Sequence, residues 1–600
     1  MVASQFMVGR GLSVAAPLLL TGLALFFGGG PGDGSVFWLG AGAILAIGVL
    51  LVTVGAPRGW PAILPLAALA LWCAVSIGWS GLPDRSWDYA NRAILYALLA
   101  GVGLWAAGRT RELANGLAIL LGAVIVWSLL GKVLPFLYDY GGPDVTRLRG
   151  PIGLWNQLAL ATGYAIALAL ARRGRAGTLL AYSALVALLL TYSRGGILTA
   201  ALVCAAWFWL TDERLESAVT LVSAALPAAV VGGIAFALPG VTSDNQSLHV
   251  RWRDGLVFGA LLLAGAAVAL ALERLRRPGD TRVLRRAAIA LGVLAVSAAV
   301  VAVAVNGIGS GAVGNGSGRI GSTSSNFRFT WWGEAWHGFT DHMLWGTGAG
   351  SFHLLNLLHR KTYLDYTIEP HNLPVQMLAE LGLVGLALFA LACFMLLRGS
   401  MHRHGHELAL ALLLPAFLVH SLVDVDWDFA AVAAPAFVAA GALAGGPAVR
   451  RMRGFSLLPA CGIGLIVLGS LISPWLAGRW ANEAADAALA GHNGRAVTLA
   501  NRAHALDPFL LAPYWAKADA AATPREAFRQ YVLAVQRQPK NPVPWLLAGE
   551  FAMNIPPDGC PYAAWQNLER YTELDQKSNG PGGDEYNAML KLVDRHAYTC

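Results

Sequence analysis

Apolar runs close to the length of a bilayer-crossing helix recur along most of this 600-residue chain. They lie at about 12–28, 36–54, 61–79, 90–107, 113–131, 152–171, 176–192, 194–210, 216–238, 254–273, 285–305, 372–397, 406–423, 427–446 and 455–477. A helix needs about 20 such residues to cross the hydrocarbon core. No run alternates as the strands of a membrane barrel do. The sequence therefore predicts an all-α, polytopic bundle of about fifteen transmembrane helices.

Composition supports an integral membrane protein. Hydrophobic residues make up 56% of the chain and charged residues only 13%, compared with about a quarter charged in soluble domains. The first apolar run follows SQFMVGR without a small-residue cleavage site, which favours a retained anchor over a removable leader. We expect contacts with membrane lipids and no nucleic-acid partner.

Basic residues predict the orientation of the bundle, because short cytoplasmic loops collect Lys and Arg. One set of alternate loops contains Arg109 and Arg111, Arg172–Arg175 and Arg274–Arg286. The opposite loops are longer and hold fewer basic residues. We therefore expect the opposite loops to be extracytoplasmic.

The chain divides into a bundle at 1–478 and a C-terminal domain at 479–600. The C-terminal part repeats small and large apolar positions and closes each unit with Pro508 or Pro539, which resembles tetratricopeptide helix pairs. An odd number of spans makes this domain extracytoplasmic, where Cys560 and Cys600 could form a disulfide. Two repeats are few, so the domain either caps the bundle or recruits an envelope-assembly partner.

A polar loop at 306–371 is the strongest functional signal, because it separates apolar runs and gathers charged and aromatic residues. It contains SSNFRFTWWGEAW, GTGAGSF and EPHN. Trp332 and Trp336 recur at helical spacing after Arg328, as on a short helix in the headgroup plane or a simple interfacial anchor. GTGAGSF lacks the Lys and the spacing of a nucleotide-binding loop and predicts a tight turn.

Arginines near the ends of apolar runs are candidates for binding phosphate, since a guanidinium forks onto phosphate oxygens. Arg194, in TYSRGG, lies between two apolar runs, where a charge requires a partner or water. The alternative for each is a solvated or snorkelling loop residue. The residues predicted to bind substrate are arginines of this kind together with polar or aromatic residues near them or in the polar loop: Arg147, Arg149, Asn156, Arg251, Arg253, Trp332, Trp336 and Asn372.

His371, in EPHN at the start of an apolar run, is the strongest catalytic candidate. A neutral imidazole can accept a proton from an attacking hydroxyl, work that suits its ordinary pKa near 6.5. Glu369 is the alternate base or the group that orients the imidazole, and Asn372 is beside it. The alternative is a histidine that caps the helix. Glu380 is an acid within the following apolar run and should face the bundle interior.

Three acidic residues, Asp424, Asp426 and Asp428, follow His420 in HSLVDVDWDF. They could hold a divalent cation, but alternate residues of a short turn point in different directions. A structural role is therefore favoured. No Cys and His spacing indicates zinc, and we expect no metal and no cofactor.

The order of RLRGPIGLWNQLAL, SRGG, FRFTWWGEAW, GTGAGSF, EPHNLPVQMLAELGLVGL and HSLVDVDWD resembles the O-antigen ligase and O-antigen polymerase superfamily over about residues 60–450. The resemblance implies a GT-C-like glycosyltransferase that takes a glycan from undecaprenyl pyrophosphate at the outer face of the bacterial inner (plasma) membrane. It implies inverting transfer to an acceptor hydroxyl without nucleotide or metal. By this resemblance, His371 matches the family's catalytic histidine, and Arg194 and Arg328 match the family's arginines that bind pyrophosphate.

These observations give one hypothesis and its alternatives. The chain is a ligase that joins a finished, lipid-linked glycan to another acceptor. If the acceptor is a second lipid-linked repeat unit, the chain is a polymerase. A transporter for the same lipid would also need a basic vestibule, although its site should lie nearer the bilayer midplane. A scaffold acting through the C-terminal domain would lose all function without residues after about 480.

Overall fold

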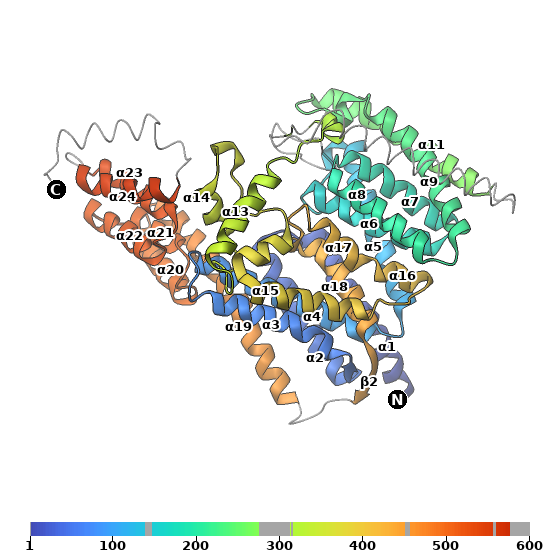
Figure 1. Ribbon diagram of the computed structural model, residues 1–600, viewed down its shortest axis with the longest axis horizontal. Helices are drawn as coiled ribbons and strands as arrows, with labels where there is room; N and C mark the ends of the chain where they lie inside the picture. The colour runs from blue at the N-terminus through green and yellow to red at the C-terminus, as the bar shows by residue number, and fades with distance from the viewer. Residues whose placement is uncertain are drawn as a thin grey trace. The chain divides into compact units, whose positions relative to one another are not determined.

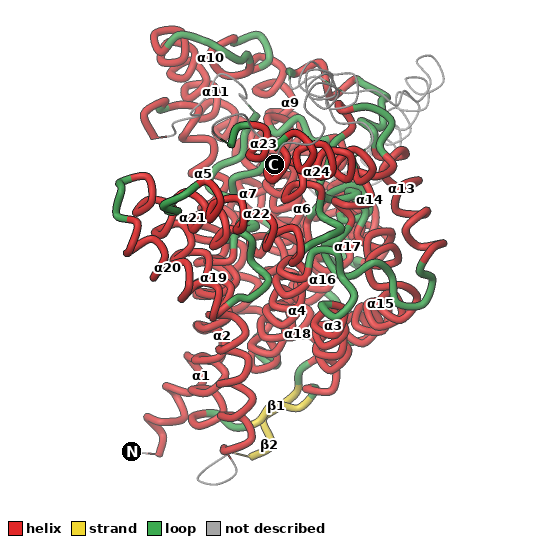
Figure 2. Tube along the Cα trace, turned by 90° about the vertical axis from the view of Figure 1, so that its left-hand side faces the viewer, coloured by secondary structure: helices red, strands yellow, loops and turns green. Residues whose placement is uncertain are grey.

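The computed structural model describes residues 2–137, 147–274, 313, 316–450, 457–555 and 560–575. Within these ranges nearly all ordered segments are helices, and one antiparallel pair joins β1 (Ala56–Arg58) to β2 (Gly446–Arg450) (Figure 2). The predicted run 285–305, the start of the polar loop at 306–312 and Cys600 lie outside the described ranges. The prediction of a helical fold is confirmed.

Among the described residues, six helices are long and apolar enough to cross a membrane. They are α2 (Asp33–Thr53), α5 (Thr110–Val133), α9 (Arg214–Ala235), α11 (Leu248–Arg274), α15 (Leu373–Arg398) and α19 (Leu458–Leu489). Shorter apolar helices accompany them. A membrane-type helical fold follows, whereas the count of about fifteen spans stays a prediction.

The chain forms two compact units. The first contains Met1–Pro65, Leu95–Asn326 and Leu391–Cys461, and the second contains Leu66–Ile94, Phe327–Ala390 and Gly462–Cys600. The polar loop from Phe327 onward and the C-terminal residues are therefore parts of the same unit. The boundary predicted between 478 and 479 falls within α19.

The first unit is a bundle of closely packed helices. Its other helices are α1 (Val2–Leu23), α6 (Trp155–Arg172), α7 (Gly174–Leu190), α8 (Arg194–Leu210), α10 (Pro239–Thr242), α16 (Gly405–Ala411), α17 (Leu413–His420) and α18 (Ala430–Ala444). Small residues permit the close approach. A Cβ on Gly441 of α18 would lie 2.0 Å from the carbonyl O of Ala100. Tyr96 stacks on Phe437 beside this contact, with ring centroids 5.0 Å apart.

The second unit combines apolar helices, the polar loop and the C-terminal helices (Figure 1). Besides most of α15 and α19, it includes most of α3 (Leu64–Ser76) and the first half of α4 (Pro83–Gly103), with α13 (Arg328–Asp341), α14 (Phe352–His359), α20 (Asn493–Leu506), α21 (Ala512–Asp519), α22 (Pro524–Arg537), α23 (Pro542–Met553) and α24 (Pro561–Leu574). Alanines of α19, α20 and α21, such as Ala484, Ala500 and Ala516, form the core where the C-terminal helices begin.

Helix α15 is broken at Gly382, which has a left-handed φ of +66°. Main-chain groups freed by the break must find partners, especially in a segment that enters a membrane. They pair with the segment 343–348, which contains the first two glycines of GTGAGSF. The N–H groups of Thr347, Gly348, Leu383 and Val384 donate to the carbonyls of Ala379, Glu380, Met343 and Leu344, respectively, at 3.1, 2.8, 2.9 and 3.3 Å.

Replacing Gly382 with alanine should destabilise this junction. With its ψ of −164°, the conformation of Gly382 is used almost only by glycine and costs a residue with a Cβ about 1–3 kcal/mol, and the added Cβ would lie 2.3 Å from the main chain of Leu344. Thermal unfolding in detergent should therefore show a lower Tm for Gly382→Ala. Gly469→Ala in α19 is the matched control, since its Cβ would meet nothing within 4 Å. Equal melting of the two variants would contradict the expected strain.

Candidate functional site

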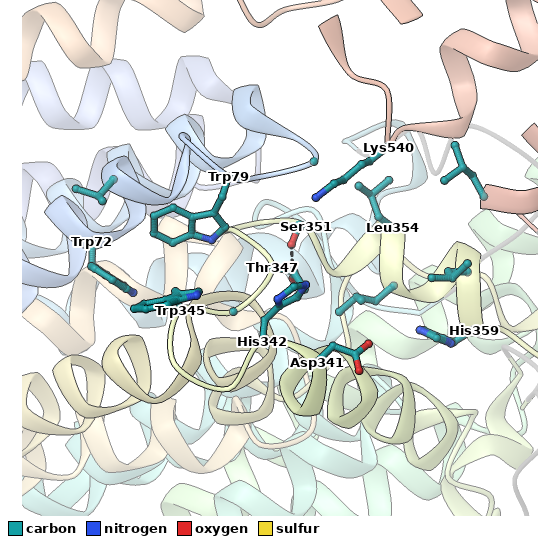
Figure 3. Close-up of a pocket in the computed structure, with 16 residues that line it drawn as sticks. Trp72, Trp79, Asp341, His342, Trp345, Thr347, Ser351, Leu354, His359 and Lys540 are labelled. Atoms are coloured by element: carbon teal, nitrogen blue, oxygen red, sulfur yellow. Dashed lines mark hydrogen bonds between the residues drawn. The ribbon is translucent and has the colours of Figure 1, made fainter. Parts of the chain in front are cut away.

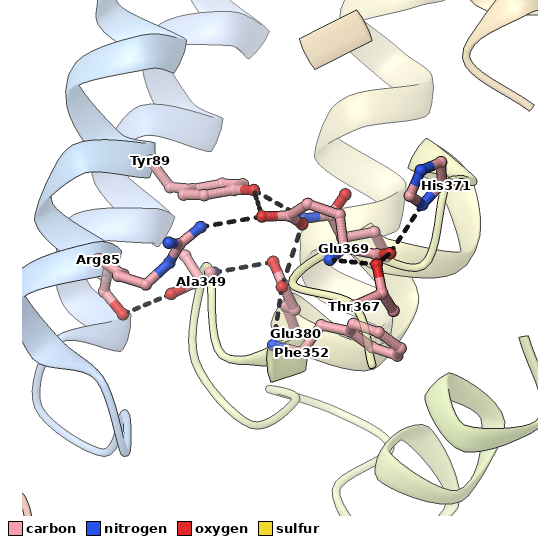
Figure 4. Close-up of polar contacts among 11 residues, drawn as sticks. Arg85, Tyr89, Ala349, Phe352, Thr367, Glu369, His371 and Glu380 are labelled. Carbon is pink, nitrogen blue, oxygen red and sulfur yellow. Dashed lines mark hydrogen bonds and ion pairs between the residues drawn. The ribbon is translucent and has the colours of Figure 1, made fainter. Parts of the chain in front are cut away.

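His371 lies just before α15 and has a left-handed φ of +54°. Its Nδ1 is 3.0 Å from the main-chain carbonyl O of Glu369 (Figure 4). A carbonyl oxygen only accepts hydrogen bonds, so Nδ1 carries the ring proton and the lone pair lies on Nε2. The backbone thus holds the imidazole in the tautomer that accepts a proton at Nε2.

Two successive tryptophans of α13 fix the EPHN turn. The Trp331 indole stacks on the His371 imidazole, with ring centroids 4.9 Å apart and planes inclined by 28°. Trp331 is buried, and its N–H donates to the carbonyl of Asp365 at 2.7 Å. The N–H of Trp332 donates to the carbonyl of Pro370 at 3.1 Å. Helix α13 therefore determines where the imidazole lies.

Arg328 is the first residue of α13, three positions before Trp331. Residues three apart are neighbours on a helix surface. The Arg328 side chain therefore leaves α13 from the side that carries the indole stacked on His371. Trp336, one turn beyond Trp332, is 56% exposed. Of the two predicted contact tryptophans, Trp332 adjoins the EPHN turn and Trp336 is on the surface.

The carboxylate of Glu369 is buried and accepts three side-chain hydrogen bonds (Figure 4). Arg85 Nη2 donates at 2.9 Å and the Tyr89 hydroxyl at 2.7 Å. Gln376 Nε2 also donates to this carboxylate. A buried carboxylate needs such a cation and donors to stay ionised. These contacts fix the main chain whose carbonyl binds His371.

Glu380 connects this network to the GTGAGSF segment. Its carboxylate is buried and accepts the main-chain N–H groups of Gly350 at 2.8 Å and Phe352 at 3.0 Å. Phe352 is the first residue of α14, where N–H groups lack helical partners, and Gly350 lies two residues before it. The acid expected to face the interior thus caps a loop helix. Asn372 similarly caps α15, since its Oδ1 accepts Val375 N–H at 3.1 Å.

In the first unit, three sequence motifs meet around Arg147. The Arg147 side chain is buried, its Nε donates to the Thr191 carbonyl at 2.8 Å, and its guanidinium lies 4.1 Å from the centre of the Trp155 ring. Asn156 accepts from Arg147 at 3.4 Å and donates to Asp424 at 2.5 Å. The motifs at 147–157, 191–194 and 420–428 therefore form one polar cluster.

The acidic residues of this cluster bind side chains of α6 and α17. Gln157 Nε2 lies 3.4 Å from Asp424 Oδ1 and 3.2 Å from Asp426 Oδ1. Asp426 also pairs with His420 Nδ1 at 2.7 Å. These contacts agree with the structural role that the sequence favours for the acidic turn.

The other predicted arginines of the first unit lie on separate elements. Arg194 begins α8 and donates to the main-chain carbonyl of Ser322. Arg149 is half-buried in the segment before α6. Arg251 and Arg253 lie in the first turns of α11, and Arg253 Nε pairs with the adjacent Asp254 at 2.8 Å.

Sequence reasoning missed Arg85, Tyr89, Gln376 and Trp331 as parts of the site. In the sequence, Arg85 is a basic residue between the predicted runs 61–79 and 90–107, and Trp331 is the neighbour of Trp332. One usable signal was present. Arg85 and Tyr89 are four residues apart, the spacing of helix neighbours, just before an apolar run, so their polar groups must face protein or water.

The buried Glu334 of α13 should make the stability of the folded chain depend on pH. Burial, together with the nearby Asp365 carboxylate, raises its pKa from 4.5 to about 7, and the hydrogen bond from Asn356 opposes this shift. The folded chain then binds this proton more tightly than the unfolded chain. The contribution of Glu334 to the free energy of unfolding therefore falls as pH rises from about 4.5 to about 7.

Glu334→Gln should abolish this loss. At pH 8 the variant should exceed the wild type in stability by about 3 kcal/mol, and below pH 4.5 the two should be equal. Tm measured against pH in detergent checks both arms, with Glu526→Gln at an exposed position as control. A pH-independent difference between Glu334→Gln and wild type would be inconsistent with a buried, titrating carboxyl group.

Comparison with known families gives a match that covers part of both units. Residues 253–390 match the model of the O-antigen ligase family, Wzy_C. This range includes Arg328, Glu369 and His371. The match confirms the resemblance of this chain to the O-antigen ligase and polymerase superfamily. The family indicates ligase- or polymerase-type glycosyl transfer in a multi-pass membrane protein. No curated protein matches the chain.

Proposed function

We propose that this protein transfers a glycan from a polyprenyl-pyrophosphate donor to an acceptor hydroxyl at the outer face of the bacterial plasma membrane, as a ligase. The observation that carries the proposal is the tautomer of His371. Its Nδ1 is tied to the main chain of Glu369, inside the segment that matches the O-antigen ligase family. An imidazole held in this way is suited to act as a general base.

In the proposed reaction, the acceptor oxygen attacks the anomeric carbon while Nε2 of His371 takes the hydroxyl proton. The bond from the anomeric carbon to the diphosphate oxygen breaks, and its electron pair leaves with the diphosphate. Arg328, at the start of α13, supplies positive charge for this leaving group. Such charge accelerates transfer only if it binds the transition state more tightly than the donor.

Glu369 takes a positioning role in this scheme. Its carboxylate already binds Arg85, Tyr89 and Gln376, which favours a structural anion over the alternative role of base. The Arg85 guanidinium favours the ionised carboxylate. Together these groups hold the carbonyl that selects the tautomer of His371.

Arg194 enters the proposal through the sequence motifs, as a second arginine that handles the pyrophosphate. The expected result is that Arg194→Ala removes transfer while the protein stays folded in detergent. Near-normal turnover of this variant would withdraw the role.

Purified protein in detergent tests the proposed activity directly. Undecaprenyl-pyrophosphate-linked glycan and a candidate acceptor are supplied, and products are separated by gel. A ligase moves the finished glycan to the new acceptor, whereas a polymerase lengthens chains on the lipid. Failure to form any glycosidic bond, with transport of the lipid in vesicles, would replace the proposal with a transporter.

A further inference from the structure

A pocket of about 650 Å³ lies within the second unit (Figure 3). His371 is not among the residues that line it. Three tryptophans line it: Trp72 of α3, Trp79 of the turn that follows, and Trp345 of the polar loop. The rings of Trp72 and Trp79 are inclined by 58°, with centroids 5.6 Å apart. Pockets of about 300–1,000 Å³ are of the size that binds small organic ligands.

Polar groups interrupt this aromatic wall. Asp341, His342 and His359 face the pocket from the polar loop, and Lys540 reaches it from the segment before α23 (Figure 3). The indole N–H of Trp79 is buried and has no hydrogen-bond partner among the described residues. The pocket therefore offers planar apolar faces together with donors and charges.

The GTGAGSF segment connects this pocket to the Glu369 network. Gly346, Thr347 and Ser351 line the pocket. Gly350, in the same segment, packs against Arg85 and Tyr89, which bind Glu369, because a Cβ at this position would lie about 3.0–3.1 Å from both side chains. A ligand in the pocket would thus contact a segment that also supports the candidate active site.

We propose that this pocket binds the saccharide portion of a substrate, as a glycan site distinct from the reacting centre, and this inference rests on the proposed glycosyl transfer. A sugar ring has an apolar C–H face and a rim of hydroxyl groups. The tryptophan faces match the first, and the charged groups of Asp341 and Lys540 match the second. Lys540 makes the C-terminal domain part of this glycan site.

An isoprenoid chain is the competing occupant, because leucines complete the lining. Burying Asp341 and Lys540 against hydrocarbon would leave charges without compensation, which is costly. Hydroxyl groups of a sugar provide that compensation. The mixture of charged and aromatic groups therefore favours the saccharide.

Binding and kinetics of two variants test the proposal. Trp345→Ala and Lys540→Ala each remove an exposed side chain, so folding should persist. The probe is the oligosaccharide released by mild acid from the lipid-linked donor, and a second arm uses the oligosaccharide of the acceptor. Saturation-transfer NMR on the full chain reports binding of each. Two variants outside the pocket lining serve as controls. Trp60→Ala removes a tryptophan that is 55% exposed, against 54% for Trp345. Lys361→Ala removes an exposed lysine of the polar loop.

Both pocket variants should weaken binding of one oligosaccharide at least tenfold and raise KM for the same substrate, with kcat nearly unchanged. The arm that responds identifies donor or acceptor. Unchanged binding of both oligosaccharides by the two pocket variants would overturn the inference. It would also be overturned if these variants lost binding only to polyprenyl phosphate and not to either oligosaccharide. Binding is measured without glycan transfer, so an absence of oligosaccharide binding to the pocket would not affect the role of His371. Oligosaccharide binding without any transfer activity would refute only the proposed function.

Discussion

Replacing His371 with asparagine should reduce glycan transfer by at least about 100-fold, the usual contribution of a general base. Asparagine is the sharper choice than alanine, because it tolerates the left-handed backbone found at this position. The amide cannot take the proton of the acceptor hydroxyl. The rate is measured with purified protein in detergent at saturating donor and acceptor, and alanine at the same position should give the same loss.

His337→Ala is the matched control, since this histidine is exposed on α13. It should retain the wild-type rate. Size-exclusion profiles and Tm show whether the variants stay folded despite the stack of His371 on Trp331. Turnover of His371→Asn within a few-fold of wild type would remove this residue from the mechanism.

Replacing Arg360 with alanine should loosen the C-terminal helices. Arg360, directly after α14, forms a bidentate pair with Asp575, directly after α24, through Nη2 contacts of 2.6 and 2.7 Å. Both side chains are only 7% exposed. Removing one partner of a buried pair costs about 3–5 kcal/mol, because the remaining charge loses its compensation. Limited proteolysis of the C-terminal helices and Tm should both report this loss.

The exposed pair of Arg570 and Glu573 offers a matched control. Its side chains are 46% and 56% exposed, so Arg570→Ala should cost at most about 1 kcal/mol. Arg360→Leu combined with Asp575→Leu should recover most of the stability, because no unpaired charge remains. Equal protease resistance of Arg360→Ala and Arg570→Ala would contradict a structural role for the buried pair.

The sequence predicted helix positions best where an apolar run ends at a charge. The run predicted at 194–210 coincides with α8, and that at 113–131 lies within α5. The run at 372–397 gives α15, yet its break at Gly382 was not predicted. Glycines are common in membrane helices, and only the distant segment 343–348 makes this one a break.

The sequence predicted the proposed reacting residues of the candidate site, but not the residues that hold them in place. His371 and Arg328 stand out as polar residues in a loop between apolar runs. Arg85 and Tyr89 reach Glu369 from 284 and 280 positions away in the chain, a pairing that depends on helix packing and leaves no local pattern. The C-terminal domain similarly gave a repeat-like pattern but no indication of its contact with the polar loop.

The central claim is that His371 removes a proton from the acceptor, and chemical rescue by azide tests it most directly. Azide is an anionic nucleophile, so it needs no base to attack the anomeric carbon. His371→Ala with donor and azide should form glycosyl azide and release the polyprenyl pyrophosphate in equal amounts, while Arg328→Ala should not be rescued. Absence of glycosyl azide with His371→Ala, or equal rescue of both variants, would contradict the assignment of His371 as the base.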